Sequence, residues 1–223
     1  MPDRLAILFD IDGTLIVSGG AGAQSWREAF DELHGVPADI GQYTDAGMTD
    51  PEVGRRTFER VIGRPPTARE LARLLSRRNS LLPKAVAESP DYRVLPGVKE
   101  LLPRLCEEGY LLGITTGGVE TAAHIKLERA HLNRYFHFGG YGSDSSDRAE
   151  LTRKAIERAS MILGAPLAGE QVLDVGDTPH DVDAAHAVGV VSVGVATGHY
   201  STDQLEEAGA DFVLSTLEDP LPL

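Results

Sequence analysis

The chain has 223 residues, enough for one sizeable hydrophobic core with an insertion or for two modest domains. Its 34 acidic residues outnumber 21 Lys and Arg residues, and the formal net charge of −13 argues against a nucleic-acid partner. No apolar stretch approaches the length of a membrane span, and the first residues lack the pattern of a signal peptide. We therefore expect a cytoplasmic protein without a membrane partner, and the sequence does not indicate the oligomeric state. The single cysteine, Cys106, excludes an internal disulfide, and its helical context predicts a core or half-buried thiol.

The first strong signal is a pair of carboxylates, Asp10 and Asp12, that directly follows the apolar run 5–9. Such a run predicts a buried parallel strand, and open α/β sheets bind ligands at the carboxyl ends of their strands. Two carboxylates this close raise each other's pKa, so a divalent cation or a proton must share the site. An ordinary solvated turn is the alternative, because Asp-Gly is common in turns.

A second apolar run, 172–175, leads into Gly176 and Asp177, and Asp181 follows at the start of a predicted helix that ends at Gly189. Asp181 could simply cap that helix, whereas Asp177 in the loop has no such role. Asp10, Asp12 and Asp177 form an all-oxygen cluster, which suits Mg²⁺ better than Zn²⁺. A magnesium site points in turn to phosphate chemistry.

Strand-like and helical segments alternate after residue 90, which predicts βαβ units and a parallel sheet. The segments are 110–115, 119–130, 136–138, 151–163, 171–175, 181–188 and 190–195. Between the first strand and residue 90, apolar residues recur at helical spacing and no second strand is predicted. We expect an α/β fold with a doubly wound, Rossmann-like parallel-sheet core (1–16 and 88–223) and an inserted α-helical cap domain (17–87). Residues 91–97 form the predicted return connection, with Pro96 opening the next helix.

These motifs resemble those of the haloacid dehalogenase-like hydrolase superfamily. Its first motif is Asp-x-Asp-Gly-Thr and its last acidic motif is commonly Gly-Asp-x-x-x-Asp, and residues 10–14 and 176–181 match both. The hydroxyl motif at the end of a strand is matched by Thr116, with Thr115 as the alternative. Many members have an Asn beside that hydroxyl, where this chain has glycines, Gly117 and Gly118. The basic motif, usually Lys, is less clear, and the two candidates are first Arg148 and then Lys154.

The resemblance, closest to the phosphoglycolate-phosphatase-like branch with a helical cap, implies a Mg²⁺-dependent phosphatase acting on a small-molecule phosphate monoester through an aspartyl-phosphate. It implies that Asp10 is the nucleophile and that Asp12 is the general acid and base. The Mg²⁺ ligands it implies are Asp10, the backbone carbonyl of Asp12, and Asp177. Asp181 would orient a metal-bound water or a basic side chain without binding the ion itself. The groups it implies for binding the phosphoryl oxygens are Thr116, Gly117 and Arg148.

The loop 43–50 joins two predicted helices of the insert and is polar with one glycine. In related proteins a cap loop of this kind faces the phosphate site, which makes Met48 and Thr49 candidate substrate-binding residues. Thr49 or Asp50 could instead cap the helix that begins at Pro51, and the two roles can coexist. His180 lies between two candidate aspartates, and a solvated loop histidine is the simpler interpretation.

Three other functions are alternatives to a phosphatase. A sugar-phosphate mutase of the same superfamily needs the same core residues, so the core motifs do not exclude it. True haloacid dehalogenases lack an acid at the position of Asp12, since a halide leaves without a proton, and its presence disfavours that chemistry. A receiver-like signalling module also surrounds one phosphorylated Asp with acidic residues, but the second Asp and the helical insert argue against it.

Overall fold

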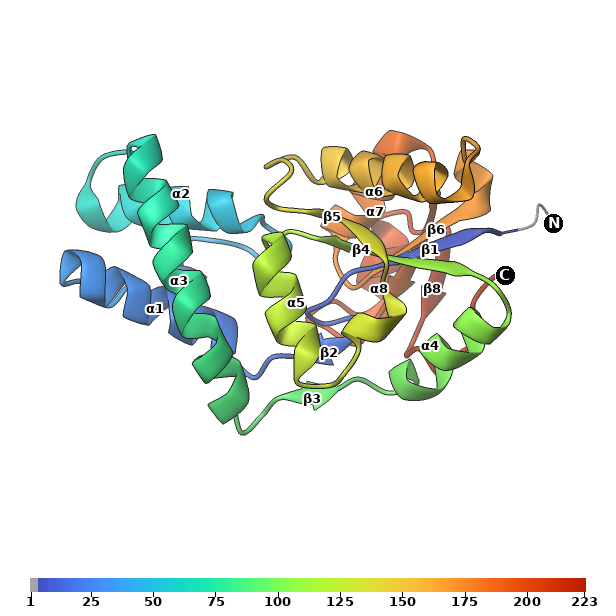
Figure 1. Ribbon diagram of the computed structural model, residues 1–223, viewed down its shortest axis with the longest axis horizontal. Helices are drawn as coiled ribbons and strands as arrows, with labels where there is room; N and C mark the ends of the chain where they lie inside the picture. Colours follow the sequence, from blue (N-terminus) through green and yellow to red (C-terminus); the bar gives the residue numbers. More distant parts are fainter. Residues whose placement is uncertain (1–3) are drawn as a thin grey trace.

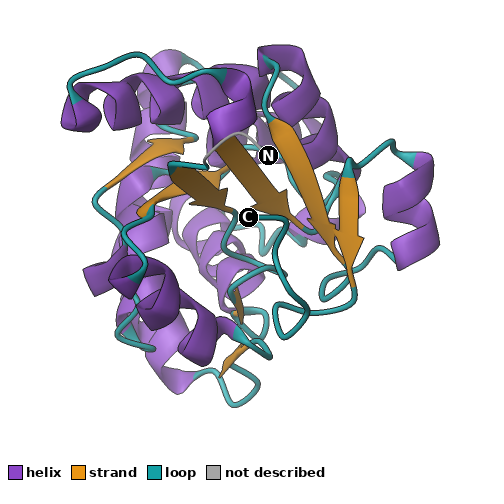
Figure 2. Cartoon of the chain, turned by 90° about the vertical axis from the view of Figure 1, so that its right-hand side faces the viewer, coloured by secondary structure: helices purple, strands orange, loops and turns teal. Residues whose placement is uncertain are grey.

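The computed structural model describes residues 4–223 and contains a six-stranded, fully parallel sheet in the order β5-β4-β1-β6-β7-β8 (Figure 1; Figure 2). The strands are β1 (Ala6–Phe9), β4 (Leu111–Thr116), β5 (Phe138–Tyr141), β6 (Val172–Gly176), β7 (Val191–Val195) and β8 (Phe212–Leu214). The predicted doubly wound α/β core is confirmed. Within the described residues, no helix combines the length and the apolar character needed to cross a bilayer.

The central strand β1 is buried on both faces, because its side chains alternate between two hydrophobic layers. Ile7 and Phe9 pack in the layer that includes α4 (Val98–Glu107) and α5 (Glu120–Glu128). Ala6 and Leu8 pack in the layer formed by α6 (Arg148–Leu163) and α7 (Pro179–Val188). A shorter helix, α8 (Thr202–Glu207), packs against β7 and β8. Helices on both faces leave the carboxyl edge of the sheet for a binding site.

The register of β1 decides which residues meet at that edge. Phe9 lies opposite Ile114 of β4 and Val175 of β6. The residues that follow these three positions are therefore level with one another at the carboxyl ends of adjacent strands. After the edge strand β5, the chain crosses to β6 on the other side of β1, so the edge beside β1 is a topological switch point.

Three helices form the insert between β1 and β4, and they lie apart from the sheet at the left of Figure 1. They are α1 (Ala21–His34), α2 (Asp50–Ile62) and α3 (Ala68–Glu88), with a 3₁₀ turn η1 (Ile40–Gln42). The insert has its own apolar cluster, whose largest buried members are Trp26, Phe30, Phe58 and Leu74. Its last helix, α3, also packs against α5 of the core.

Two short strands lie at the base of the insert, and the first of them precedes residue 90, where no second strand is predicted. They are β2 (Ile16–Val17) and β3 (Arg93–Val94), which pair antiparallel and bring the two connections together. Two residues are too few to show a period-2 pattern, which is why the sequence did not reveal them. Pro96 also lies outside the next helix, because Gly97 with φ +83° is the N-cap of α4.

Three other expectations need correction. The strand predicted at 136–138 corresponds to β5, which begins at Phe138 and continues through two glycines to Tyr141. A side chain at Gly140 would not fit, because its Cβ would lie 1.8 Å from the Leu151 carbonyl oxygen. The predicted helix 151–163 begins earlier, at Arg148, because the Asp147 side chain caps its first turn. Cys106 is exposed, since it lies on the outer side of α4 beside the buried Leu105.

Two further 3₁₀ turns, η2 (Asn133–Tyr135) and η3 (Gly169–Gln171), lie in core loops.

Candidate active site

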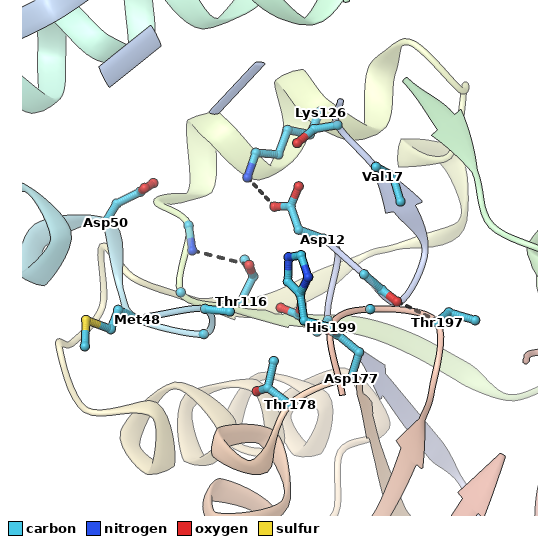
Figure 3. A pocket seen from close by; sticks show the side chains of 18 of the residues that line it. Asp12, Val17, Met48, Asp50, Thr116, Lys126, Asp177, Thr178, Thr197 and His199 are labelled. Carbon is cyan, nitrogen blue, oxygen red and sulfur yellow. Dashed lines mark hydrogen bonds and ion pairs between the residues drawn. The ribbon is translucent and has the colours of Figure 1, made fainter. Parts of the chain in front are cut away.

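A cavity of about 500 Å³ opens at the carboxyl edge of the sheet, between the core loops and the loop that precedes α2 (Figure 3). Most of the candidate residues named from the sequence line it. From the core these are Asp10, Asp12, Thr116, Gly117, Arg148 and Asp177, and from the insert Met48. Thr49 lies in an adjoining hollow, and Asp181 lies behind the wall of the cavity, against Arg148.

Three carboxylates, two that follow the strands β1 and β6 and one in the first turn of α7, form the acidic centre of the site. Asp10, Asp177 and Asp181 each offer an oxygen within 4.8 Å of the others, and all three side chains are buried. Burial, followed by repulsion from Asp181, raises the pKa of Asp10 to about 7. Burial and repulsion from Asp10 raise the pKa of Asp177 to about 8. Buried carboxylates that repel one another in this way fit a divalent cation, and their oxygen donors fit Mg²⁺.

Two glycines, Gly13 and Gly198, allow the backbone to approach the Asp177 carboxylate closely. A Cβ at Gly13 would lie 2.2 Å from Asp177 Oδ2, and Gly13 also has φ +91°. A Cβ at Gly198 would lie 1.7 Å from the same oxygen. The Thr197 hydroxyl donates to the Gly13 carbonyl at 2.6 Å, which ties these two loops together. The close approach of both loops fixes the Asp177 carboxylate toward Asp10.

Arg148 and Asp181 form a buried pair at the start of two adjacent helices. The Arg148 guanidinium contacts the Asp181 carboxylate and lies 3.5 Å from Asp10 Oδ1. Asp181 also accepts hydrogen bonds from the Thr178 amide at 3.0 Å and the Thr178 hydroxyl at 2.7 Å, so it caps α7 as well. Lys154, the second candidate for the basic motif, lies exposed on α6 and pairs with Glu157 instead.

The two threonines at the end of β4 point in opposite directions, as alternation along a strand requires. The Thr115 hydroxyl donates to the buried Asp174 at 2.7 Å, below the site. Thr116 faces the cavity, and its hydroxyl accepts from the Gly118 amide at 3.3 Å. Of the two candidates, Thr116 is therefore the one available to a ligand.

Lys126 is a cavity residue that the sequence analysis did not identify. Its ammonium contacts Asp12 Oδ2, as Figure 3 shows, and the whole residue is only 8% exposed. Burial acts to raise the pKa of Asp12, but the charge and hydrogen bond of Lys126, with smaller contributions from Ser18 and Arg78, outweigh it and lower this pKa. The signal was present in the sequence, because Lys126 shares the inward face of α5 with Ala122 and Ala123, where a charged residue needs a partner.

The loop before α2 is joined to the core by backbone and side-chain contacts. The Asp50 amide donates to the Gly117 carbonyl at 2.7 Å, and the Asp50 carboxylate accepts from the Val119 amide at 2.9 Å. The same carboxylate lies 3.2 Å from the buried Arg78 of α3. Arg148 donates to the Gly47 carbonyl at 3.0 Å. These contacts close the cavity on the side of the insert.

The capping role considered for Thr49 and Asp50 is only partly present. Thr49 occupies the N-cap position of α2, but its side chain makes no capping hydrogen bond. Its hydroxyl is buried without a partner in the described structure. Asp50 is the first residue of the helix and directs its carboxylate to the core instead of to its own backbone. His180 is close to the same loop, since a Cβ at Gly47 would lie 2.9 Å from its ring.

The sequence model of the haloacid dehalogenase-like hydrolase family matches residues 5–189. The chain belongs to this family. A probable phosphatase IndB from Dickeya dadantii is 26% identical over 96% of this chain and 90% of the relative. A phosphoglycolate phosphatase from Escherichia coli O157:H7 is 26% identical over 99% of this chain and 92% of the relative.

Solved structures of similar proteins share the fold over nearly the whole chain. A hydrolase from Pseudomonas syringae superposes with a TM-score of 0.73 at 27% identity, covering 96% of this chain and 94% of the other. A putative beta-phosphoglucomutase from Bacteroides vulgatus, at 22% identity and a TM-score of 0.70, covers 97% of this chain and 86% of the other and shows the shared fold alone. The resemblance inferred from the motifs, and with it the class of phosphatase-type hydrolase, is confirmed.

The acidic cluster predicts that Mg²⁺ binding depends on pH. Burial and mutual repulsion raise the pKa of Asp10 to about 7 and the pKa of Asp177 to about 8 in the metal-free fold, above their ordinary value of 3.8. Between about pH 4 and pH 8, the folded state therefore binds more protons than the unfolded chain. The free energy of unfolding of the metal-free protein falls as the pH rises through this range. Because Mg²⁺ must displace those protons, its affinity rises over the same window.

Calorimetric titration of Mg²⁺ in buffers of different ionisation enthalpy counts the protons released. We expect release at about pH 6 and little release above about pH 8.5. Thermal unfolding in EDTA checks the other half of the prediction. A Mg²⁺ affinity that stays constant between these pH values would contradict the proposed proton-metal exchange.

The geometry around Arg148 predicts which basic residue serves the site. Arg148→Ala removes the guanidinium nearest Asp10, so kcat/KM for a phosphate ester should fall on the order of 100-fold or more with the fold intact. Lys154→Ala, on the same helix but paired with Glu157 on the surface, is the matched control and should be near neutral. Steady-state kinetics of the two variants decide the assignment, and the reverse pattern would give the role to Lys154.

Proposed function

We propose that the chain is a Mg²⁺-dependent phosphatase that hydrolyses a small-molecule phosphate monoester through an aspartyl-phosphate on Asp10. The observation that carries this proposal is the convergence of Asp10 and Asp12 on one cavity, with Thr116 and Arg148 on its wall and Asp177 beside Asp10. Family membership supports hydrolysis, and the phosphatase relatives support a phosphate ester as substrate.

Asp10 is proposed as the nucleophile because it is the carboxylate on which the other groups converge. A phosphate ester dianion is repelled by a carboxylate, so positive charge must offset the approach of the two. Arg148, 3.5 Å from Asp10 Oδ1, and the Thr116 hydroxyl are placed to bind the phosphoryl oxygens. Gly117 lines the cavity beside Thr116, and we propose that it also contributes to binding of the phosphoryl oxygens.

Asp12 is proposed to transfer protons in both steps of the reaction. In the first step, Asp10 forms a bond to phosphorus while the bond to the ester oxygen breaks, and Asp12 gives that oxygen a proton. In the second step, Asp12 takes a proton from the water that attacks the aspartyl-phosphate, which releases phosphate and restores Asp10. The Asp12 side chain is 40% exposed toward the cavity, so solvent and leaving group can both reach it.

The residues proposed to hold Mg²⁺ are Asp10, the backbone carbonyl of Asp12, and Asp177. When bound, the ion would neutralise the negative charge that gathers on the phosphoryl oxygens. Asp181 is proposed to orient Arg148 and a bound water, since its oxygens are already engaged by Thr178 and Arg148. The raised pKa values of Asp10 and Asp177 support a cation at this point.

The helical insert is proposed to act as a cap that covers the site and selects the substrate. Its loop contacts the core through Gly47 and Asp50, and such closure excludes water while the phosphoryl group is transferred. Met48 reaches the cavity beside Gly117, where it would meet the part of the substrate beyond the phosphate. We propose that Met48 and Thr49 contribute to substrate choice. The domain limits 17–87 for this cap are part of the same proposal.

A screen of phosphate esters with Mg²⁺ present tests the function. Phosphoglycolate, sugar phosphates, nucleotides and pyrophosphate should include at least one substrate that releases inorganic phosphate. A mutase would return a sugar phosphate isomer in place of free phosphate, so product analysis of the same reactions separates the two activities. Absence of phosphate release from every compound, p-nitrophenyl phosphate included, would contradict a phosphatase.

The two aspartates predict different phosphoenzyme behaviour. Asp10→Asn removes the nucleophile, so no phosphoenzyme forms from any substrate. Asp12→Asn keeps the nucleophile, and p-nitrophenyl phosphate can still phosphorylate Asp10 because its phenolate leaves without a proton. The adduct then persists, since no base activates water. Rapid quench and intact-mass measurements should show a product burst and added phosphate mass only for Asp12→Asn. A phosphorylated Asp10→Asn enzyme would eliminate Asp10 as the nucleophile.

A further inference from the structure

Lys126 and Asp12 form the ion pair of the cavity that the proposed reaction leaves unexplained. The Lys126 side chain is only 10% exposed, whereas the Asp12 side chain with which it pairs is 40% exposed. Figure 3 shows the lysine reaching from its helix to the carboxylate, on the far side of Asp12 from Asp177. The ammonium, which also lines the cavity, therefore contacts Asp12 Oδ2 and leaves part of the carboxylate open to the cavity.

The helix that carries Lys126 is held firmly at this point. Tyr92 donates its hydroxyl to the Lys126 carbonyl at 2.7 Å, and Arg129 donates to the Ser89 carbonyl at 2.8 Å. The apolar side of α5 packs on the end of α3, in a cluster that includes Val86 and Ala122. The lysine is thus anchored to both the core and the base of the insert, which reduces the conformational freedom of its backbone and stem.

The Asp12 carboxylate needs such an anchor because of its neighbours. The carboxylates of Asp10 and Asp177 lie in the same cavity, and like charges repel in a poorly solvated site. Lys126 is the single Lys or Arg that pairs with Asp12 within residues 4–223. Without it, repulsion would favour rotamers that turn the carboxylate out of the cavity.

We propose that Lys126 is a positioning residue that holds the Asp12 carboxylate toward the leaving-group side of the cavity. This inference rests on the proposed function, because it assumes that Asp12 transfers the protons. The positioning role of Lys126 differs from that of a purely structural ion pair in one respect. A positioning residue affects only those steps in which Asp12 acts, whereas a structural pair affects every substrate and step alike.

The experiment compares Lys126→Met and Lys126→Arg, each made in the wild type and in Asp12→Asn. Lys126→Met should lower kcat for the best alkyl phosphate of the screen by about 10- to 100-fold, part of the factor that acid–base catalysis supplies. The burst of p-nitrophenol should persist, with a slowed steady state, since that leaving group needs no proton. Lys126→Arg should recover part of kcat. In the Asp12→Asn background, Lys126→Met should cause little further loss, because one group acts through the other.

Lys99 is exposed on α4, and Lys99→Met is the control for loss of a lysine elsewhere on the core. Thermal unfolding verifies that each variant folds. If Lys126→Met does not fold, Lys126→Gln is held to the same criteria. An unchanged kcat in Lys126→Met, an equal loss of burst and steady-state rates, or full additivity with Asp12→Asn would each overturn the inference. Failure of the wild type itself to form a phosphoenzyme would overturn the proposed function, an outcome separate from these.

Discussion

Repulsion between buried carboxylates at the carboxyl edge of the sheet is the constraint on which the rest of the site depends. Parallel strands β1 and β6 bring Asp10 and Asp177 together, and helix α7 adds Asp181 from the same side. Negative charge at this density is unfavourable in a poorly solvated site unless cations balance it. Arg148 balances it beside Asp10 and Asp181, and Lys126 balances the charge of Asp12. The oxygens of the three clustered aspartates lie close enough together to suit a divalent ion.

The site is shared between two parts of the fold, the core and the insert. Asp10, Asp177, Asp181 and Arg148 come from the core, and Arg148 donates to the Gly47 carbonyl of the insert loop. The Asp50 carboxylate of the same loop accepts from the Val119 amide of the core. Arg148 contacts Asp10, Asp181 and the Gly47 carbonyl at once. The arginine thus connects the position of the insert loop to the charge balance around Asp10, the proposed nucleophile, which gives a physical reason for the proposed closure and catalysis to be linked.

The sequence predicted the parts of this site that stand in short motifs on regular elements. Asp10 and Asp177 follow apolar strands, and the parallel topology alone brings such strand ends together. The paired strands β2 and β3 were missed because two residues carry no periodicity, and β5 was displaced because its glycines are selected by close packing of α6. Lys126 was missed because its partner, Asp12, is 114 positions away in the chain. A lysine on an apolar helix face signals a buried partner but does not identify it.

The central claim is that the phosphoryl group passes through Asp10 on its way to water, and the stereochemistry at phosphorus tests this most directly. Each in-line displacement inverts the configuration, so two successive displacements retain it. Hydrolysis of a phosphorothioate ester made chiral at phosphorus with sulfur and two oxygen isotopes, in water enriched in the third isotope, followed by analysis of the configuration of the released thiophosphate, reads the outcome without any substitution in the enzyme. We predict retention. Inversion would mean that water attacks the ester directly, and it would contradict the aspartyl-phosphate and the role given to Asp10.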